Sequence, residues 1–155
     1  MQFLRPSRAW YVCALLTALM IATVATAAAP PTIPPAAKGR EFSGYFDVSN
    51  IQEQGDMVQV TLHVKIFNHN NYDAKSIVIA LVDSTPSGML LGNFQPVKVW
   101  KGQQFLTTSQ KFTVTKSEFA QWLMAPAQPN LVILYQDTKG NTLQKTAQLS
   151  HRPLF

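Results

Sequence analysis

The stretch Val58 to Ile66, VQVTLHVKI, decides the fold, because apolar and polar residues alternate in it without interruption. Five apolar residues fall on one side of an extended chain and four polar residues fall on the other. This period of two is typical of a half-buried β-strand, whereas a helix would scatter the same residues around its circumference. The stretch therefore predicts a strand with one face in a hydrophobic core.

The same pattern continues on both sides of this strand. Phe42, Gly44, Phe46 and Val48 share one face of an expected first strand, and Asn50 to Asp56 is a turn region. The further expected strands are Ile77–Val82, Phe105–Val114, Asn130–Gln136 and Leu143–Leu149, with Met89–Phe94 and Pro96–Trp100 as a short, irregular edge segment.

One helix is expected within this β pattern. Thr115 and Glu118 have the spacing of a capping box, in which the threonine caps an amide and the glutamate reaches back. Phe119, Trp122 and Leu123 would share one face of the helix, and prolines at 126 and 129 end it. The count is about seven strands and one short helix. It predicts an all-β, immunoglobulin-like or fibronectin-like two-sheet sandwich over residues 41–150, with a tail at 151–155.

Part of this region resembles a known family. The residues concerned are VTLHVKIFNHNNYDAKSIVIAL from Val60 to Leu81, then Gly88, Leu91-Gly92 with Phe94, and Lys101-Gly102-Gln103 before a strand ending in Phe112-Thr113-Val114. They resemble the late-embryogenesis-abundant type-two domain over Val58 to Val114. His69 replaces the proline expected in that family's Asn-Pro-Asn turn, and the helix after Thr115 lies outside the pattern. The resemblance implies a β-sandwich without catalytic activity.

The N-terminus has the features of a secretory signal peptide. Arg5 and Arg8 precede the mostly apolar run Trp10 to Val24, and Ala25-Thr26-Ala27 provides a cleavage site. We expect cleavage after Ala27, with Ala28 as the alternative. The other interpretation is an uncleaved membrane anchor, since Trp10 to Ala29 reaches the roughly 20 residues that span a bilayer. Either way the domain is exported, to the periplasm or the extracellular space.

Residues 28–40 form a proline-rich linker, which favours an extended spacer. The chain has one cysteine, Cys13, and it lies inside the expected signal peptide. The exported part then has no disulfide and depends on its hydrophobic core, for which about 128 residues are sufficient.

The net charge gives no indication of nucleic-acid binding. The whole chain carries +5, and loss of Arg5 and Arg8 with the signal peptide leaves +3. The remaining basic residues are scattered, whereas nucleic-acid binding needs clustered ones.

The sequence contains none of the short motifs that mark the common catalytic, P-loop or dinucleotide sites. We therefore expect no enzymatic activity, no cofactor and no metal. His63, His69 and Asp73 are the nearest approach to a metal site, with His151 as a further candidate ligand, and a small metal-dependent enzyme is the remotest alternative.

Carbohydrate binding is another alternative, because exposed aromatic rings can stack on sugars. Trp100 is the main candidate, since Val97 and Val99 are expected to face the core and leave Lys98 and Trp100 outside. Phe67 and Tyr72 are further candidate glycan contacts. The competing interpretation is that Trp100 covers the edge of the core.

The most specific hypothesis concerns Ile77–Val82 and Leu131–Tyr135, which are apolar on both faces and could be neighbours in one sheet. One face of each belongs to the core. The other would expose an apolar patch made of Val78, Ala80, Val82, Val132 and Leu134. We expect the helix with Phe119 and Trp122 to cover it; if the helix lies elsewhere, the patch binds a protein partner in the cell envelope. The sequence thus predicts a non-catalytic, exported binding or envelope-assembly module.

Overall fold

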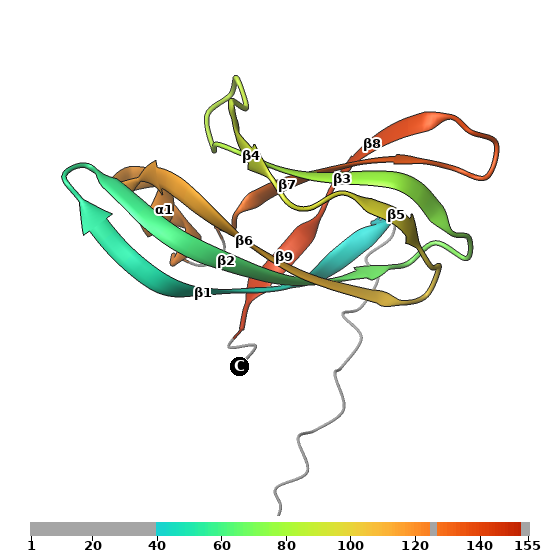
Figure 1. The fold of residues 1–155 in the computed structure, drawn as a ribbon, viewed down its shortest axis with the longest axis horizontal. Helices are drawn as coiled ribbons and strands as arrows, with labels where there is room; N and C mark the ends of the chain where they lie inside the picture. Colours follow the sequence, from blue (N-terminus) through green and yellow to red (C-terminus); the bar gives the residue numbers. More distant parts are fainter. Residues whose placement is uncertain (1–39, 125–126, 153–155) are drawn as a thin grey trace, which may run out of the picture. The chain divides into compact units, whose positions relative to one another are not determined.

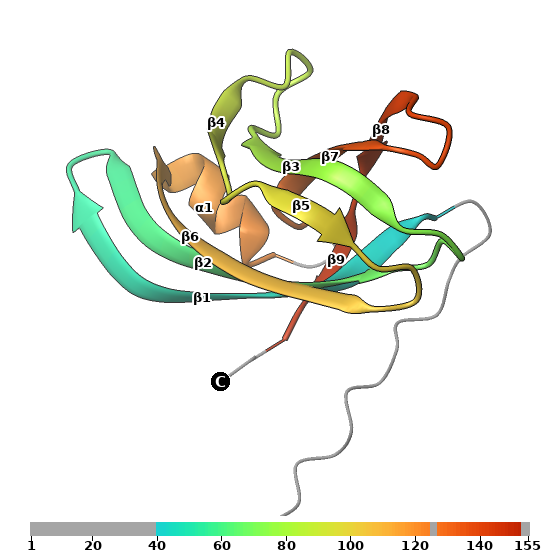
Figure 2. The ribbon, with the colours of Figure 1, turned by 45° about the vertical axis from the view of Figure 1, so that its right-hand side comes forward.

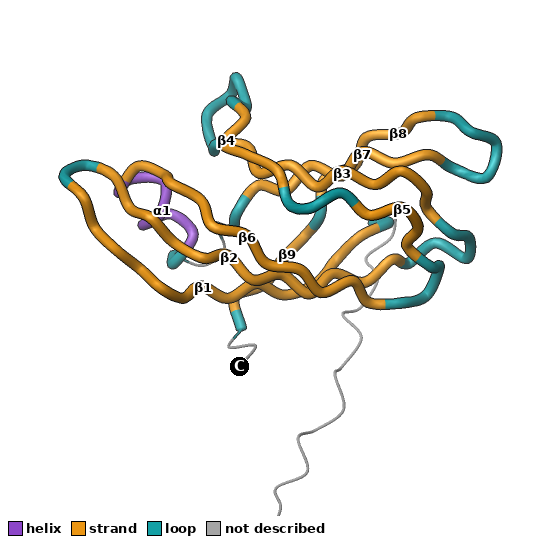
Figure 3. Tube along the Cα trace, viewed as in Figure 1, coloured by secondary structure: helices purple, strands orange, loops and turns teal. Residues whose placement is uncertain are grey.

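The computed structural model describes residues 40–124 and 127–152, so the expected signal peptide at 1–27 and most of the linker at 28–40 lie outside the described residues. The described residues form nine strands and one helix, arranged as two sheets (Figure 1). Strands make up most of the described residues, as the tube in Figure 3 shows. The expected fold class, an all-β two-sheet sandwich, is confirmed.

The four-stranded sheet has the order β6-β2-β1-β9. Its members are β1 (Phe42–Gln54), β2 (Met57–Asn68), β6 (Phe105–Thr115) and β9 (Gln148–His151). The five-stranded sheet has the order β4-β3-β7-β8, and β5 also pairs with β3. Its members are β3 (Ala74–Val82), β4 (Leu90–Asn93), β5 (Val97–Trp100), β7 (Asn130–Gln136) and β8 (Thr142–Thr146).

The alternation read from the sequence produces the core. All five apolar residues of the Val58–Ile66 stretch are at most 2% exposed. They face the inner residues of β3 and β7, and burying these branched aliphatic side chains is the main term that stabilises the sandwich. The inner residues of the two strands are Ile77, Ile79 and Leu81 of β3 with Leu131, Ile133 and Tyr135 of β7.

Two expected elements are divided in the structure. The expected strand Leu143–Leu149 becomes β8 and β9, which belong to different sheets: β8 pairs with β7, and β9 runs parallel to β1. Ala147 stands between them, fully buried, where the chain crosses from one sheet to the other. The irregular edge segment becomes β4 and β5, which pair with different parts of β3.

The helix α1 (Lys116–Trp122) follows β6 directly and lies on the inner side of the β2–β6 pair (Figure 2). The Thr115 hydroxyl accepts a hydrogen bond from the Glu118 amide, as expected for the helix cap. The Glu118 carboxylate does not reach back, however, because it accepts the indole N–H of Trp122 and two hydrogen bonds from Ser84. Trp122 is buried, whereas Leu123 is 49% exposed and does not share its face.

A buried asparagine holds two loops together at one end of the sandwich. The Asn68 side chain is fully buried at the end of β2. Its Nδ2 donates to the carbonyl oxygens of Tyr72, Trp100 and Lys101 at 3.3–3.5 Å. Its Oδ1 accepts from the backbone amide and the side-chain amide of Asn70 at 3.1 and 2.9 Å. The turn after β2 is therefore also the anchor for the loop after β5.

Candidate protein-binding face

The outer surface of the five-stranded sheet is the strongest candidate site. Its centre lies where β3 and β7 are apolar on both faces. Val78 stands opposite Leu134 and Ala80 stands opposite Val132, so the expected neighbours do form one continuous patch with Val82. Directly paired residues of antiparallel strands project from the same side of a sheet, so these five side chains face away from the core.

The flanking strands complete this outer face. On the β8 side, Thr146 is paired with Val132 and Gln144 with Leu134. On the β4 side, Asn93 is paired with Ala80, and Leu90 is paired with Val82. We call the whole set the β3–β7 face: Val78, Ala80, Val82, Val132 and Leu134 at the centre, with Leu90, Asn93, Gln144 and Thr146 at the sides. It has an apolar centre, hydroxyl and amide groups at its sides, and no charged member.

The expectation that the helix covers this patch is wrong. The main contacts of α1 are with β6 and β2, which belong to the other sheet. Trp122 enters the core together with Val58 and Val114. A short helix that follows β6 without a linker is held near the end of that strand, and it cannot cross to the far side of the sandwich. No other described helix is present to cover the β3–β7 face.

The face is partly exposed. Ala80 is 6% exposed, and its four central neighbours are half-buried. Leu90 is 58% exposed and Met89, just before it, is 62% exposed, so the apolar surface continues onto β4. Leu90 could not be assigned to this site from the sequence, because the pairing of β4 with β3 shifts between Leu81 and Val82 and cannot be obtained from alternation alone.

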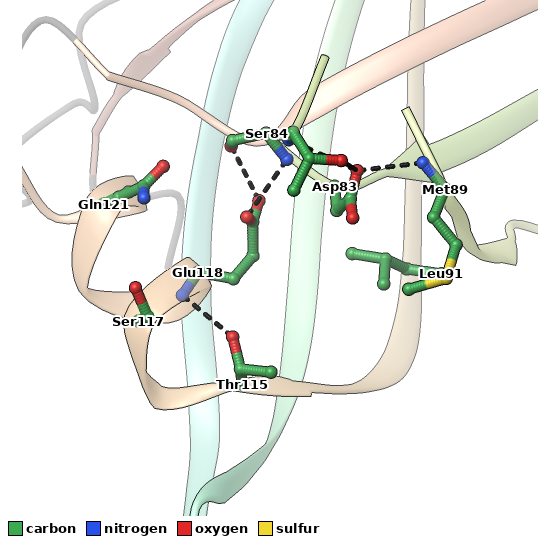
Figure 4. A pocket seen from close by; sticks show the side chains of 9 residues that line it. Asp83, Ser84, Met89, Leu91, Thr115, Ser117, Glu118 and Gln121 are labelled. Carbon is green, nitrogen blue, oxygen red and sulfur yellow. Dashed lines mark hydrogen bonds between the residues drawn. The ribbon is translucent and has the colours of Figure 1, made fainter. Parts of the chain in front are cut away.

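A cleft of about 240 Å³ lies between the β3–β4 loop and α1 (Figure 4). Asp83 and Glu118 both line it and are 9% and 8% exposed. Asp83 Oδ1 accepts hydrogen bonds from the Thr85 hydroxyl at 2.7 Å and from the Met89 amide at 2.8 Å. These bonds outweigh the effect of burial and hold the pKa of Asp83 below its usual value. Because Ser84 and Trp122 occupy the Glu118 carboxylate, both acids have a structural role here.

This cleft could not be predicted from the sequence. The spacing of Thr115 and Glu118 was its only signal, and that spacing predicted a capping contact rather than a bond to Ser84.

The predicted exposure of Trp100 is wrong. Its side chain is 3% exposed, its ring centroid lies 5.0 Å from that of Phe42, and its Nε1 donates to the Gln104 carbonyl. Strict alternation fails here because Ser76 of β3 has φ 50°, and the pairing of β3 with β7 shifts between Lys75 and Val78. Trp100 consequently follows Ala74 into the core, as the competing interpretation had it.

The other two proposed glycan contacts do not form a stacking platform either. Phe67 is 3% exposed, and its ring contacts those of Phe105 and His69 at 4.9 Å. Tyr72 is half-buried, and its hydroxyl lies 3.4 Å from that of Tyr135. The structure thus leaves none of the three with a freely exposed ring face.

The candidate metal ligands point to separate partners. His63 Nε2 lies 2.7 Å from Ser49 Oγ, and His69 Nε2 lies 2.6 Å from Ser43 Oγ. Asp73 accepts from the Lys101 ammonium and the Gly102 amide. His151 lies near Asp47, with 3.7 Å between Nε2 and Oδ1. Within residues 40–124 and 127–152, no three His, Cys, Asp or Glu side chains are grouped to hold a metal ion.

A charged cluster joins the two sheets beside the first strand. Glu41 accepts a hydrogen bond from the Tyr135 hydroxyl and forms an ion pair with Lys145, whose Nζ lies 2.8 Å from Oε1. Burial alone would raise the pKa of Glu41, but the bonds from Lys145 and Tyr135 outweigh it and lower this pKa below its ordinary value. Burial is the largest cause of the raised pKa of Tyr135, and the hydrogen bond to Glu41 is the next, so the Tyr135 hydroxyl stays protonated.

Comparisons with known proteins leave the family open. No protein-family model matches the chain, and no curated protein matches it either. A solved structure of a GH20 exo-β-N-acetylglucosaminidase from Vibrio harveyi, in complex with N-acetylglucosamine, is similar with a TM-score of 0.38 and 12% identity. The similarity covers 71% of this chain and 18% of the Vibrio chain, and at this TM-score it carries no inference about activity. Among the described residues, α1 has seven residues and no helix could cross a membrane.

Proposed function

We propose that this protein is an exported, non-catalytic binding module that docks a protein partner of the cell envelope on the β3–β7 face. The observation that carries the proposal is the uncovered apolar centre of that face, with neutral polar residues on both sides. Protein interfaces have this composition, with an apolar core depleted in charge and a polar rim. The features of a secretory signal peptide at the N-terminus support export.

The patch is suited to a partner because the fold does not need it. The inner residues of β3 and β7 already fill the core, and Ile77, Ile79, Leu131 and Ile133 are at most 1% exposed. Val78, Val82, Val132 and Leu134 add a second apolar layer on the solvent side. Small apolar patches on a soluble surface are ordinary, but a contiguous one across two central strands marks an interaction site.

The test is affinity capture from the native envelope with four baits, the unaltered protein and three variants. Leu134→Glu places a charge at the centre of the face, and Val82→Glu places one at its end. Gln59→Glu is the matched control, because Gln59 lies on β2, one of the two inner strands of the other sheet, and is also half-buried. We expect the same partner on the unaltered bait and the Gln59→Glu bait, and its loss from the other two baits. Burying an unpaired charge in an apolar interface removes most of the affinity.

Thermal unfolding of all four proteins accompanies the capture. We expect melting temperatures within a few degrees of one another, since half-buried outer positions contribute little to the core. A partner that is retained equally by the Leu134→Glu and Val82→Glu baits would exclude the β3–β7 face as its binding site.

A further inference from the structure

The sandwich has four sheet edges, and three of them carry features that prevent another strand from pairing. On the β8 edge, Lys145 is paired with the buried residue Ile133 and so projects toward the inner layer, where it contacts Glu41. An inward-pointing charge on an edge strand is one of the devices by which natural proteins block edge-to-edge association.

The β4–β5 edge and the β9 edge are interrupted or short. β4 and β5 have four residues each and are separated by a segment that contains Pro96. The pairing of β4 also shifts at Leu81/Val82. β9 has four residues and pairs with β1 only at Ser43–Phe46; beyond it the edge continues as β1, whose pairing with β2 shifts between Ser49 and Gln52. A short, bulged or proline-containing edge offers too few aligned backbone groups for a stable added strand.

The β6 edge has none of these features. β6 runs for 11 residues and pairs with β2 from Phe105 to Thr115 without a register shift. It contains no proline, and Lys111 is its only charged residue. Its composition, rich in threonine and phenylalanine, favours extended structure. Among the described strands none pairs with the side of β6 that faces away from β2.

We propose that a second copy of this chain pairs with β6 through its own β6, antiparallel and across a twofold axis. The register in which all 11 residues pair has Gln110 opposite Gln110. In this register the inner-face residues Leu106 and Val114 stand opposite each other. On the outer face Lys111 stands opposite Ser109, so the only charge of the strand meets no like charge.

Self-complementarity favours a second copy over a different protein as the occupant. The pairing is isologous, so each copy offers the same backbone groups, and the two four-stranded sheets become one continuous sheet. The β3–β7 face belongs to the other sheet and does not take part. This inference is therefore independent of the proposed function, and either could fail alone.

The first test is sedimentation of the purified protein over a concentration range up to about 100 µM, which detects weak dimers. We expect the unaltered protein to dimerise. Gln110→Lys places two ammonium groups together on the twofold axis and raises the dimer dissociation constant by roughly tenfold or more. Gln59→Lys is the control, because Gln59 is the same residue type and also half-buried, but lies on β2, inside the same sheet and away from the twofold axis; it leaves the dimer unchanged.

A cysteine on the twofold axis provides a second test, which does not require the folded protein to accept a new charge at this position. Opposite residues of an antiparallel pair have Cα atoms about 4.5–5.5 Å apart, within the range of a disulfide. Since Cys13 is the only natural cysteine, Gln110→Cys should form a covalent dimer on mild oxidation far faster than Gln59→Cys does.

A monomeric unaltered protein over the whole concentration range would overturn the inference. So would equal crosslinking of the two cysteine variants, or a Gln110→Lys variant that is folded and still dimerises like the unaltered protein.

Discussion

Replacing Asn68 with alanine tests how far one buried side chain holds the end of the sandwich together. Asn68 is fully buried and makes five hydrogen bonds, three from Nδ2 and two to Oδ1. These bonds join β2 to the loop after it and to the loop after β5. Alanine removes all of them and leaves the backbone groups of Asn70, Trp100 and Lys101 without these partners.

The expected loss in the free energy of unfolding is about 2–4 kcal/mol. A net hydrogen bond contributes roughly 0.5–1.5 kcal/mol, and a buried group that loses its partner costs about 1–3 kcal/mol. The three Nδ2 bonds are long, at 3.3–3.5 Å, so each contributes a free energy at the lower end of the range for a net hydrogen bond. The shorter Oδ1 bonds to Asn70 account for most of the effect.

Urea unfolding at equilibrium measures this loss as a fall in the midpoint with an unchanged slope. Asn71→Ala is the matched control, because Asn71 is the same residue type in the same loop and is exposed. We expect that control to change the stability by no more than about 0.5 kcal/mol. If Asn68→Ala costs less than about 1 kcal/mol, the two loops are held by other contacts and the reasoning is refuted.

Two further changes test neighbouring features. In Gly102→Ala the new Cβ would lie 2.8 Å from the carbonyl oxygens of Asn70 and Tyr72, so unfolding measurements should show a loss of roughly 2 kcal/mol or more from overpacking. Gly55→Ala, whose Cβ meets nothing within 4 Å although its φ is +57°, should cost less, and equal losses would contradict the proposed clash. Glu41 has a lowered pKa in the folded protein, so its contribution is present above its unfolded pKa of about 4.3 and is lost as the pH falls through the lower folded value. Glu41→Gln should therefore reduce stability at neutral pH and flatten its decline below about pH 5 in melting curves; unchanged acid sensitivity would rule out this role.

The strands with clean alternation could be predicted from the sequence for a simple reason. In Val58–Ile66, and where Val78–Val82 of β3 pairs with Asn130–Leu134 of β7, each residue's face follows from its position, because the pairing there is regular. The same rule placed the five central members of the β3–β7 face together, although the two strands are about 50 residues apart in the chain.

Three features were predicted wrongly: the direction of Trp100, the single strand Leu143–Leu149 and the position of the helix. They depend on backbone conformations that composition does not reveal. Ser76 is a non-glycine residue with positive φ, and this reverses the expected direction of Trp100. The crossing at Ala147 divides one apparent strand between two sheets. The position of α1 depends on which side of β6 the chain turns toward, and the amphipathic pattern of a seven-residue helix fits either side.

The most direct test of the binding face is photocrosslinking in the native cells, with a photoreactive phenylalanine analogue at Leu134 or, as control, at Gln59. If the β3–β7 face docks a protein, the Leu134 position gives a discrete crosslinked species with a second protein, and the Gln59 position does not. If Leu134 gives no adduct, or if both positions give the same one, this sheet surface is not where a partner binds.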